Sequence, residues 1–183
     1  MKALLVVTVF VALAMVVAAP AEAQTPNIGV FFDNGFSRMD QDCPGAGVMD
    51  TLYVVARNFD RYLMAVEYSI NYPPSMFWVA DLDLPALHIG SSPTGITEGF
   101  PTPQNGYNAL LVAKVVFMWM CAGCTIITDM PVVVEPHPGT GFLGAVDFPN
   151  YDLVPAVGMK SLVCATVPIE ETTWGQIKSL YGE

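Results

Sequence analysis

The sequence is poor in positive charge. It has 7 Lys and Arg residues against 17 Asp and Glu residues in a chain of 183, and its formal net charge is −10. Nucleic-acid binding depends on clustered cations that neutralise phosphates, and the sequence contains no such cluster. Anionic membrane surfaces attract basic segments for the same reason. The composition therefore argues against nucleic acids and anionic membranes as partners.

Residues and motifs typical of catalysis are also scarce. The only histidines are His88 and His137, and neither accompanies a recognisable serine or cysteine nucleophile motif. The GxSxG and HExxH patterns are missing. His137 lies between Pro136 and Pro138, which predicts an exposed residue in a rigid turn. We therefore expect a protein that is not an enzyme, with no catalytic residue, no metal and no cofactor.

Acidic residues support the main alternative. Asp81 and Asp83 alternate along a predicted strand, and Asp33, Asp40 and Asp42 lie in or beside the first long loop. Two carboxylates at a suitable separation can hydrolyse glycosidic bonds, so a secreted hydrolase that acts on glycans is the competing function. Either group could hold Ca²⁺, but neither has the spacing of an EF-hand loop. Solvated acidic loops are the simpler interpretation.

The four cysteines predict disulfides. An exported chain with Cys43, Cys121, Cys124 and Cys164 is expected to form two bridges. We favour the pairs Cys121 with Cys124 and Cys43 with Cys164. A thioredoxin-like redox site would need the CAGC sequence to open a helix, but residues 125–127 favour a strand. The spacings also do not form the two CxxC pairs of a four-cysteine zinc site.

The N-terminus has the pattern of a secretory signal peptide. Residues 1–23 contain one Lys, an apolar core, a proline and a final Ala-Glu-Ala triplet. The alternative is an N-terminal membrane anchor, although the apolar core is marginal for a span. Removing residues 1–23 leaves enough chain for one domain with a single core. We expect this domain to be secreted, periplasmic or at the cell surface, with no membrane span in the mature chain.

The longest apolar run after the N-terminus covers residues 108–124. Its β-branched and aromatic residues predict a central strand, although a buried helix remains an alternative. Alternate residues of this run form an apolar row that we expect to face the core: Leu111, Ala113, Val115, Phe117, Trp119 and Cys121.

Other strand-sized segments recur at intervals of roughly 8–12 residues, separated by glycine and proline. Residues 50–57 and 62–70 flank a short polar turn at 58–60, which predicts an antiparallel hairpin. In the second of these strands, we expect one face to carry Met64, Val66, Tyr68 and Ile70. The remaining segments lie at 27–33, 76–82, 86–90, 96–100, 125–128, 131–135, 144–147 and 161–165, and residues 101–106 form a predicted loop. This pattern predicts an all-β antiparallel sandwich, jelly-roll or immunoglobulin-like, over residues 24–168.

The C-terminal residues 169–183 differ in character. A short helix is predicted there, with Trp174, Ile177 and Tyr181 on one apolar stripe. Gly175 weakens this helix relative to alanine. The stripe either packs on the domain or contacts a partner. Apolar residues within the domain, such as Phe77 and Trp78, are a second candidate contact.

Three segments occur in an order typical of one family. They are LYVVARN, AVEYSINYPPSMFWVAD and NGYNALLVAKVVF. In this order the sequence resembles cohesin-like β-sandwiches, within the wider group of secreted immunoglobulin-like and carbohydrate-binding-module-like domains. The resemblance implies a jelly-roll-like sandwich that binds protein or glycan. We therefore expect an exported, non-catalytic binding or structural module.

Overall fold

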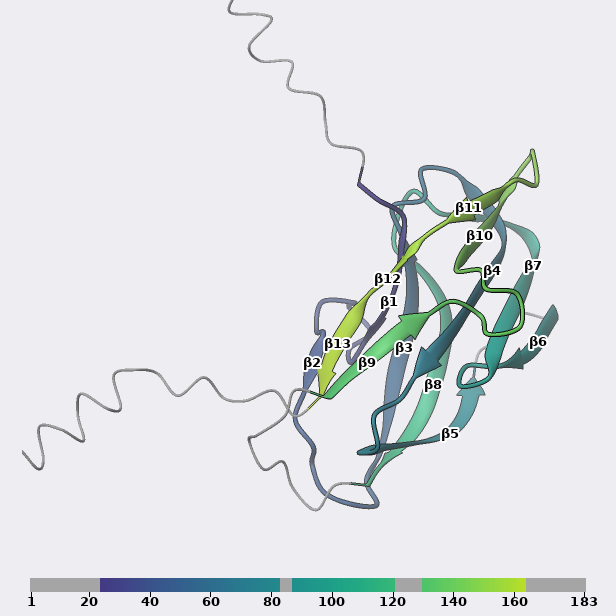
Figure 1. The fold of residues 1–183 in the computed structure, drawn as a ribbon. Helices are drawn as coiled ribbons and strands as arrows, with labels where there is room; N and C mark the ends of the chain where they lie inside the picture. Colours follow the sequence, from purple (N-terminus) through teal and green to yellow (C-terminus); the bar gives the residue numbers. More distant parts are fainter. Residues whose placement is uncertain (1–23, 83–86, 121–129, 164–183) are drawn as a thin grey trace, which may run out of the picture.

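The computed structural model describes residues 24–82, 87–120 and 130–163. The regular elements of these residues are all β-strands (Figure 1). No helix within them is long and apolar enough to cross a membrane. The predictions that lie outside the described residues are the signal peptide at 1–23, the strand at 125–128, the helix within 169–183, Asp83, Cys121, Cys124, Cys164, Trp174, Ile177 and Tyr181.

One layer of the fold is a five-stranded sheet with the order β12-β1-β3-β8-β5. Its pairings are antiparallel, apart from the parallel contact between β1 and β12. Its strands are β1 (Asn27–Phe31), β3 (Met49–Arg57), β5 (Met76–Leu82), β8 (Leu110–Trp119) and β12 (Val157–Gly158).

The second layer is an eight-stranded sheet. Its main order is β11-β10-β4-β9-β13-β2; β7 pairs with β4, and β6 pairs with β7 at the edge. Only the contact between β13 and β2 is parallel. Its strands are β2 (Asp40–Gln41), β4 (Tyr62–Asn71), β6 (Leu87–Ser91), β7 (Gly95–Asn105), β9 (Met130–Glu135), β10 (Gly144–Phe148), β11 (Leu153–Pro155) and β13 (Lys160–Val163).

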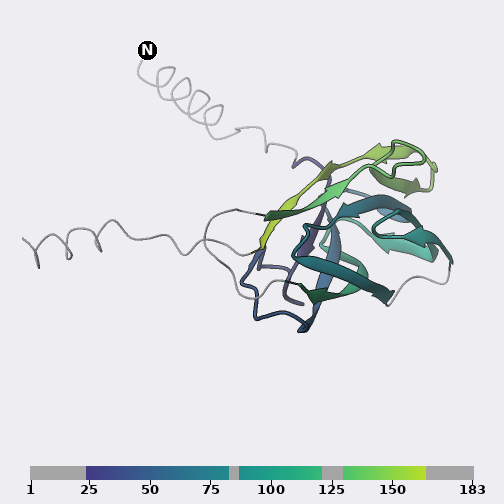
Figure 2. The same ribbon diagram turned by 60° about the horizontal axis from the view of Figure 1, so that its bottom comes forward.

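The two sheets pack face to face, as the two ribbon views show together (Figures 1 and 2). Their inner faces meet in one apolar core. This arrangement confirms the predicted all-β, mostly antiparallel sandwich. The very short strands β2, β11 and β12 were not predicted, because two or three residues are too few to show an alternating pattern.

The predicted central strand is confirmed as β8, which lies between β3 and β5. Its row Ala113, Val115, Phe117 and Trp119 is buried in the core. Leu111 is only half-buried, and Val112 is buried instead. The pairing of β3 with β8 shifts at this point, because Val54 faces Ala113 whereas Val55 faces Leu111. This bulge breaks the alternation on which the prediction relied.

The predicted hairpin between residues 50–57 and 62–70 is wrong. The strands form, but β3 and β4 belong to different sheets. Asn58 and Asp60 have left-handed backbones with φ of 61° and 53°, and Phe59 between them is fully buried. The connection therefore crosses from one sheet to the other, with the Phe59 ring in the core.

Strand β4 departs from perfect alternation. Val66, Tyr68 and Ile70 are buried as predicted, but the half-buried Met64 is replaced in the core by Leu63. In the pairing of β4 with β10, Leu63 faces Asp147 and Ala65 faces Val146, so Met64 is the extra residue of a bulge.

The predicted loop at residues 101–106 is also wrong, because β7 continues to Asn105. Its prolines fall in the part of β7 that has no partner residues on β4. A proline lacks the N–H group that a paired position needs, so the strand can continue there.

Candidate functional site

An apolar row crosses the outer face of the eight-stranded sheet. The strand registers place Leu87 of β6 beside Gly99 of β7, Gly99 beside Ala65 of β4, and Ala65 beside Val146 of β10. Val146 in turn faces Leu153 of β11. Residues that face one another on paired strands point to the same side of a sheet. The row therefore spans five strands on one surface.

A second row runs parallel to the first. It places Ile89 beside Thr97, Thr97 beside Glu67, and Glu67 beside Gly144. Glu67 accepts a hydrogen bond from the Thr140 hydroxyl, which ties the loop after β9 to this surface.

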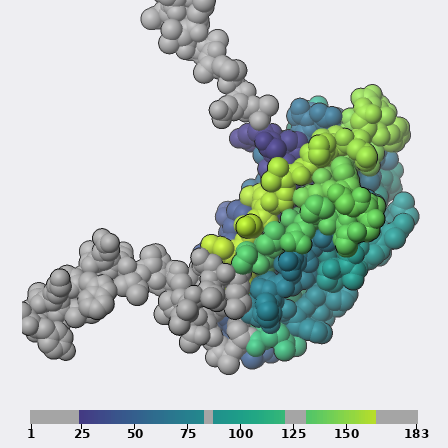
Figure 3. Space-filling view, in the orientation of Figure 1, coloured from purple at the N-terminus to yellow at the C-terminus, as the bar shows by residue number. Residues whose placement is uncertain are grey.

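The residues that lie between the two rows point to the inner side of the sheet. Val66, Glu98 and Ala145 are examples, and all three are buried. This alternation confirms that both rows face outward. Figure 3 views the molecule from the side of the eight-stranded sheet, with β9 to β13 in green and yellow beside the teal of β7.

This surface contains a small hollow. The hollow is lined in part by Ala65, Thr97, Phe142, Val146 and Leu153. The Leu87 side chain leans over Gly99, since a Cβ built on Gly99 would lie 3.1 Å from the Leu87 Cδ2 atom.

We call the set Leu87, Ile89, Ala65, Val146 and Leu153 the outer patch. Leu87, Ile89 and Leu153 are 66%, 70% and 66% exposed. Burial of such a side chain contributes roughly 1.5–3 kcal/mol, and the isolated domain forgoes most of this. A contiguous apolar patch of this kind is typical of a contact surface for another protein.

The aromatic candidates from the sequence lie elsewhere. Phe77 is 56% exposed on β5, and the register places it beside Met118 on the outer face of the five-stranded sheet. Trp78 is half-buried and packs against the core. Its indole N–H donates to Asp81 Oδ1 over 3.2 Å. Phe77 remains an exposed apolar group, whereas Trp78 belongs to the internal structure.

The Asp81 carboxylate is occupied by local hydrogen bonds. It accepts from the backbone N–H of Ser92 at 2.9 Å and from the Ser92 hydroxyl, in addition to Trp78. These bonds link β5 to the turn between β6 and β7. Asp83, its proposed catalytic partner, lies outside the described residues.

A buried carboxyl group was missed in the sequence. Glu98 is fully buried, and Tyr68 donates a hydrogen bond of 2.6 Å to its Oε1 atom. Burial raises the pKa of Glu98 to about 8; the Tyr68 hydrogen bond opposes this, and the charge of Asp81 adds to it. Glu98 is therefore largely protonated at neutral pH. The alternation of Ile96, Glu98 and Phe100 could have revealed its inward direction.

The acids of the first loop separate in the structure. Asp33 accepts hydrogen bonds from the backbone N–H groups of Gly35, Ser37 and Arg38. These bonds, led by that from Arg38, lower the pKa of Asp33 below its usual value. Asp40 and Asp42 are exposed. Within residues 24–82, 87–120 and 130–163, no group of three or more His, Cys, Asp or Glu residues could hold a metal ion.

Comparison with known proteins gives a structural match only. No protein-family model and no curated protein matches the chain. A chain of the CaDoc0917–CaCohA2 complex has a TM-score of 0.51 at 15% identity, covering 78% of this chain and 100% of its own. CaCohA2 from Clostridium acetobutylicum in solution has a TM-score of 0.48 at 13% identity, with 80% and 94% covered.

A type I cohesin–dockerin complex from Clostridium thermocellum gives a TM-score of 0.48 at 10% identity, with 76% and 99% covered. The match with a TM-score of 0.51 shows that the fold is that of a cohesin-like β-sandwich. The predicted resemblance is therefore confirmed at the level of the fold.

Two further predicted positions can be placed on this cohesin-like sandwich. His137 is half-buried rather than exposed. Its Nδ1 atom accepts from the Gly139 N–H at 3.0 Å, and its ring packs against Gly95. Cys43 is half-buried against the core. None of the described cysteines is free, but the predicted pairings involve residues outside the described ranges and stay predictions.

Proposed function

We propose that this chain is a non-catalytic protein-binding module that contacts its partner through the outer patch. The observation that carries the proposal is that Leu87, Ile89 and Leu153 are exposed on the same surface of one sheet. Strand pairing fixes the backbone of these residues, so the ordering entropy lost on binding is that of the side chains alone. Gly99 and Ala65 lie between these leucines in the same row, so the row has no large side chain of its own at its centre.

The related structures suggest which class of partner to test first. The structure with a TM-score of 0.51 is a complex of two proteins, and the complex from Clostridium thermocellum is described as a cohesin with a dockerin. A dockerin-like protein is therefore the first candidate. The partner must present an apolar surface that complements the outer patch.

The competing hydrolase function has less support. A glycosidase needs two carboxylates that face a bound sugar. Asp81 instead accepts three hydrogen bonds from Ser92 and Trp78. Glu98 is enclosed in the core, where substrate has no access.

Export and the C-terminal segment complete the proposal. Residues 1–23 would act as a signal peptide and deliver the domain to an oxidising exterior, where Cys43 would pair with Cys164 and Cys121 with Cys124. Residues 169–183 would form a separate tail, whose Trp174, Ile177 and Tyr181 provide a second apolar contact.

Substitutions in the outer patch test the proposal. Isothermal titration against a dockerin panel, together with capture from the native envelope or medium, would compare wild type with Leu87→Ser and Leu153→Ser. Each substitution should weaken binding at least tenfold, or about 1.4 kcal/mol. Phe77→Ser is the matched control, because Phe77 is similarly exposed on the opposite sheet. Binding that survives both patch substitutions but is lost in Phe77→Ser would show that the contact lies on the other face.

A further inference from the structure

Four exposed aromatic residues gather at one end of the outer face. Tyr62, Tyr107, Phe148 and Tyr151 are 47%, 57%, 39% and 61% exposed. Tyr62 of β4 faces Phe148 of β10 across the pair of strands. The Tyr107 ring meets the Tyr62 ring edge to face at 5.9 Å, and the Tyr151 ring meets the Phe148 ring in the same way at 6.0 Å. We call these four residues the aromatic platform.

The aromatic platform is not required by the core. Each ring keeps a large exposed area although the sandwich has a complete apolar interior. Tyr151 also has a left-handed backbone with φ of 61°, a conformation that bulky residues rarely adopt and that glycine or asparagine adopts readily. A tyrosine at such a position indicates a use for its side chain outside the fold.

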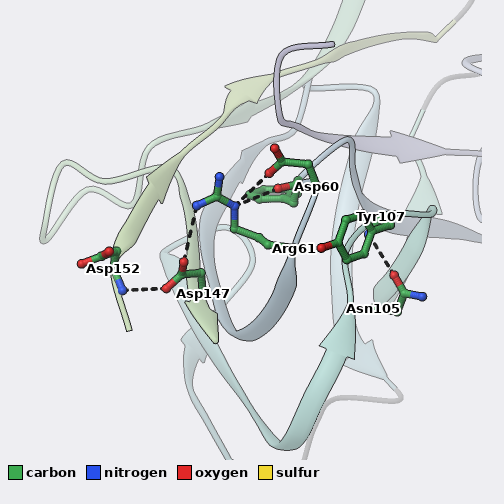
Figure 4. Close-up of polar contacts among 7 residues, drawn as sticks. Asp60, Arg61, Asn105, Tyr107, Asp147 and Asp152 are labelled. Atoms are coloured by element: carbon green, nitrogen blue, oxygen red, sulfur yellow. Dashed lines mark hydrogen bonds and ion pairs between the residues drawn. The ribbon is translucent and has the colours of Figure 1, made fainter. Parts of the chain in front are cut away.

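Fixed polar groups border the rings. Arg61 lies between Asp60 and Asp147 (Figure 4), with its Nε atom 2.9 Å from Asp60 Oδ1 and its Nη1 atom 3.4 Å from Asp147 Oδ2. Asp147 is buried, and its Oδ1 atom accepts from the Asp152 N–H at 2.8 Å. Beside Tyr107, the Asn105 amide oxygen accepts from the Tyr107 N–H at 2.9 Å.

These contacts place both donors and acceptors around the rings. Asp60 and Asp152 are exposed acceptors, and the Tyr62 and Tyr107 hydroxyls can act in either role. Arg61 is held by two carboxylates, so its charge is already balanced. The surroundings therefore offer hydrogen bonds without a net positive charge.

A sugar chain has the matching chemistry. One face of a pyranose ring presents C–H groups that stack on an aromatic ring, while its hydroxyl groups both donate and accept hydrogen bonds. We propose that the aromatic platform binds a neutral oligosaccharide. Tyr62 and Phe148 face one another on neighbouring strands, which lie about 4.8 Å apart. Tyr107 and Tyr151 extend the platform from the segments that follow β7 and β10. Asp60 and Asp152 would repel an acidic sugar, and the formal net charge of −10 adds to this repulsion.

This inference does not depend on the proposed protein contact. The outer patch is aliphatic and the aromatic platform is ringed by polar groups, so separate substitutions address them. Loss of partner-protein binding in Leu87→Ser says nothing about sugar binding, and the reverse also holds.

The test is affinity gel electrophoresis of the full mature protein in gels that contain hydroxyethyl cellulose, xylan or galactomannan, with polygalacturonate as the acidic probe. Wild type should be retarded by at least one neutral polysaccharide and not by polygalacturonate. Tyr62→Ala and Tyr107→Ala should each weaken this retardation about tenfold, whereas Tyr107→Phe should retain most of it. Phe77→Ala, an exposed aromatic on the opposite sheet, is the control and should behave as wild type.

Thermal unfolding of each variant separates loss of binding from loss of folding. Tyr151→Ala provides a second probe, because Tyr151 is the most exposed ring of the platform. The inference is overturned if wild type binds none of the neutral polysaccharides, if folded platform variants bind as wild type does, or if only a protein partner requires the platform.

Discussion

At the residue scale, Glu98 makes the stability of the fold depend on pH. Its pKa is raised from 4.5 to about 8, first because burial disfavours the charged form. The unfolded chain releases this proton near pH 4.5, but the folded chain holds it until about pH 8. Between these values the folded state binds more protons, so its stability falls as pH rises. We expect wild type to lose on the order of a few kcal/mol between pH 5 and pH 8 through this group.

Glu98→Gln tests this expectation, because glutamine keeps the shape and can accept the Tyr68 hydrogen bond but does not ionise. Urea unfolding at pH 5 and pH 8 should show a much smaller pH dependence in the variant. An equal pH dependence in wild type and Glu98→Gln would contradict the assignment. Asp33 does not interfere, because its lowered pKa affects stability only as pH falls below about its usual value of 3.8.

At the scale of single elements, β8 carries the centre of the core. Phe117 is fully buried, and its ring meets the Trp119 ring at 5.0 Å and the Phe32 ring at 6.5 Å. Phe117→Ala should therefore destabilise the fold by about 3–5 kcal/mol, through lost burial and the cavity that remains. Chemical denaturation measures this change. Phe77→Ala, at an exposed position of β5, should change stability by about 0.5 kcal/mol or less.

The turn between β6 and β7 depends on a glycine. Gly95 has φ of 99°, and a Cβ there would lie 2.6 Å from the His137 ring. Gly95→Ala should lower the thermal midpoint, because it adds backbone strain and displaces the ring. His137→Ala removes the clash but not the strain, so the double variant should recover only part of the loss. Full recovery would show that backbone strain at Gly95 is negligible.

Strand alternation explains which elements could be predicted. Strand β5 was predicted with its observed bounds, and the β8 row from Ala113 to Trp119 was placed correctly in the core. The errors occur where one residue breaks the period, as at Val112 and Met64. A bulge depends on the partner strand, so local sequence does not reveal it. The hairpin between β3 and β4 was predicted wrongly for a similar reason. Phe59 is buried between the two sheets, and the local sequence does not show that a second sheet covers it.

At the scale of the whole molecule, the candidate site depends on strand order. Leu87 and Leu153 are far apart in sequence and share a surface only because β6, β7, β4, β10 and β11 lie side by side. No local pattern contains that order, and the sequence therefore directed attention to Phe77, Trp78 and the C-terminal residues. The sandwich class was predictable from periodicity, whereas its binding surfaces required the topology.

The predicted cysteine pairing would link two distant parts of this topology. Cys43 precedes β3 and is half-buried against the core, while Cys164 directly follows β13. Strand β13 pairs with β2, and Leu162 faces Asp40. Cys164 and Cys43 each follow this pair by a few residues in the sequence. The pairs Cys43 with Cys164 and Cys121 with Cys124 therefore stay predictions.

Peptide mapping of the exported protein without reduction decides the pairing. We expect no free thiol, one peptide linking Cys43 to Cys164, and one containing an internal Cys121–Cys124 bridge. Closing so long a loop limits the unfolded chain, so Cys43→Ser with Cys164→Ser should cost about 4–5 kcal/mol in the chain-entropy model. The double substitution Cys121→Ser with Cys124→Ser removes a predicted bridge that closes a much smaller loop, so it should cost less. Recovery of a peptide that links Cys43 to Cys121 or to Cys124 would show that the chain is connected differently.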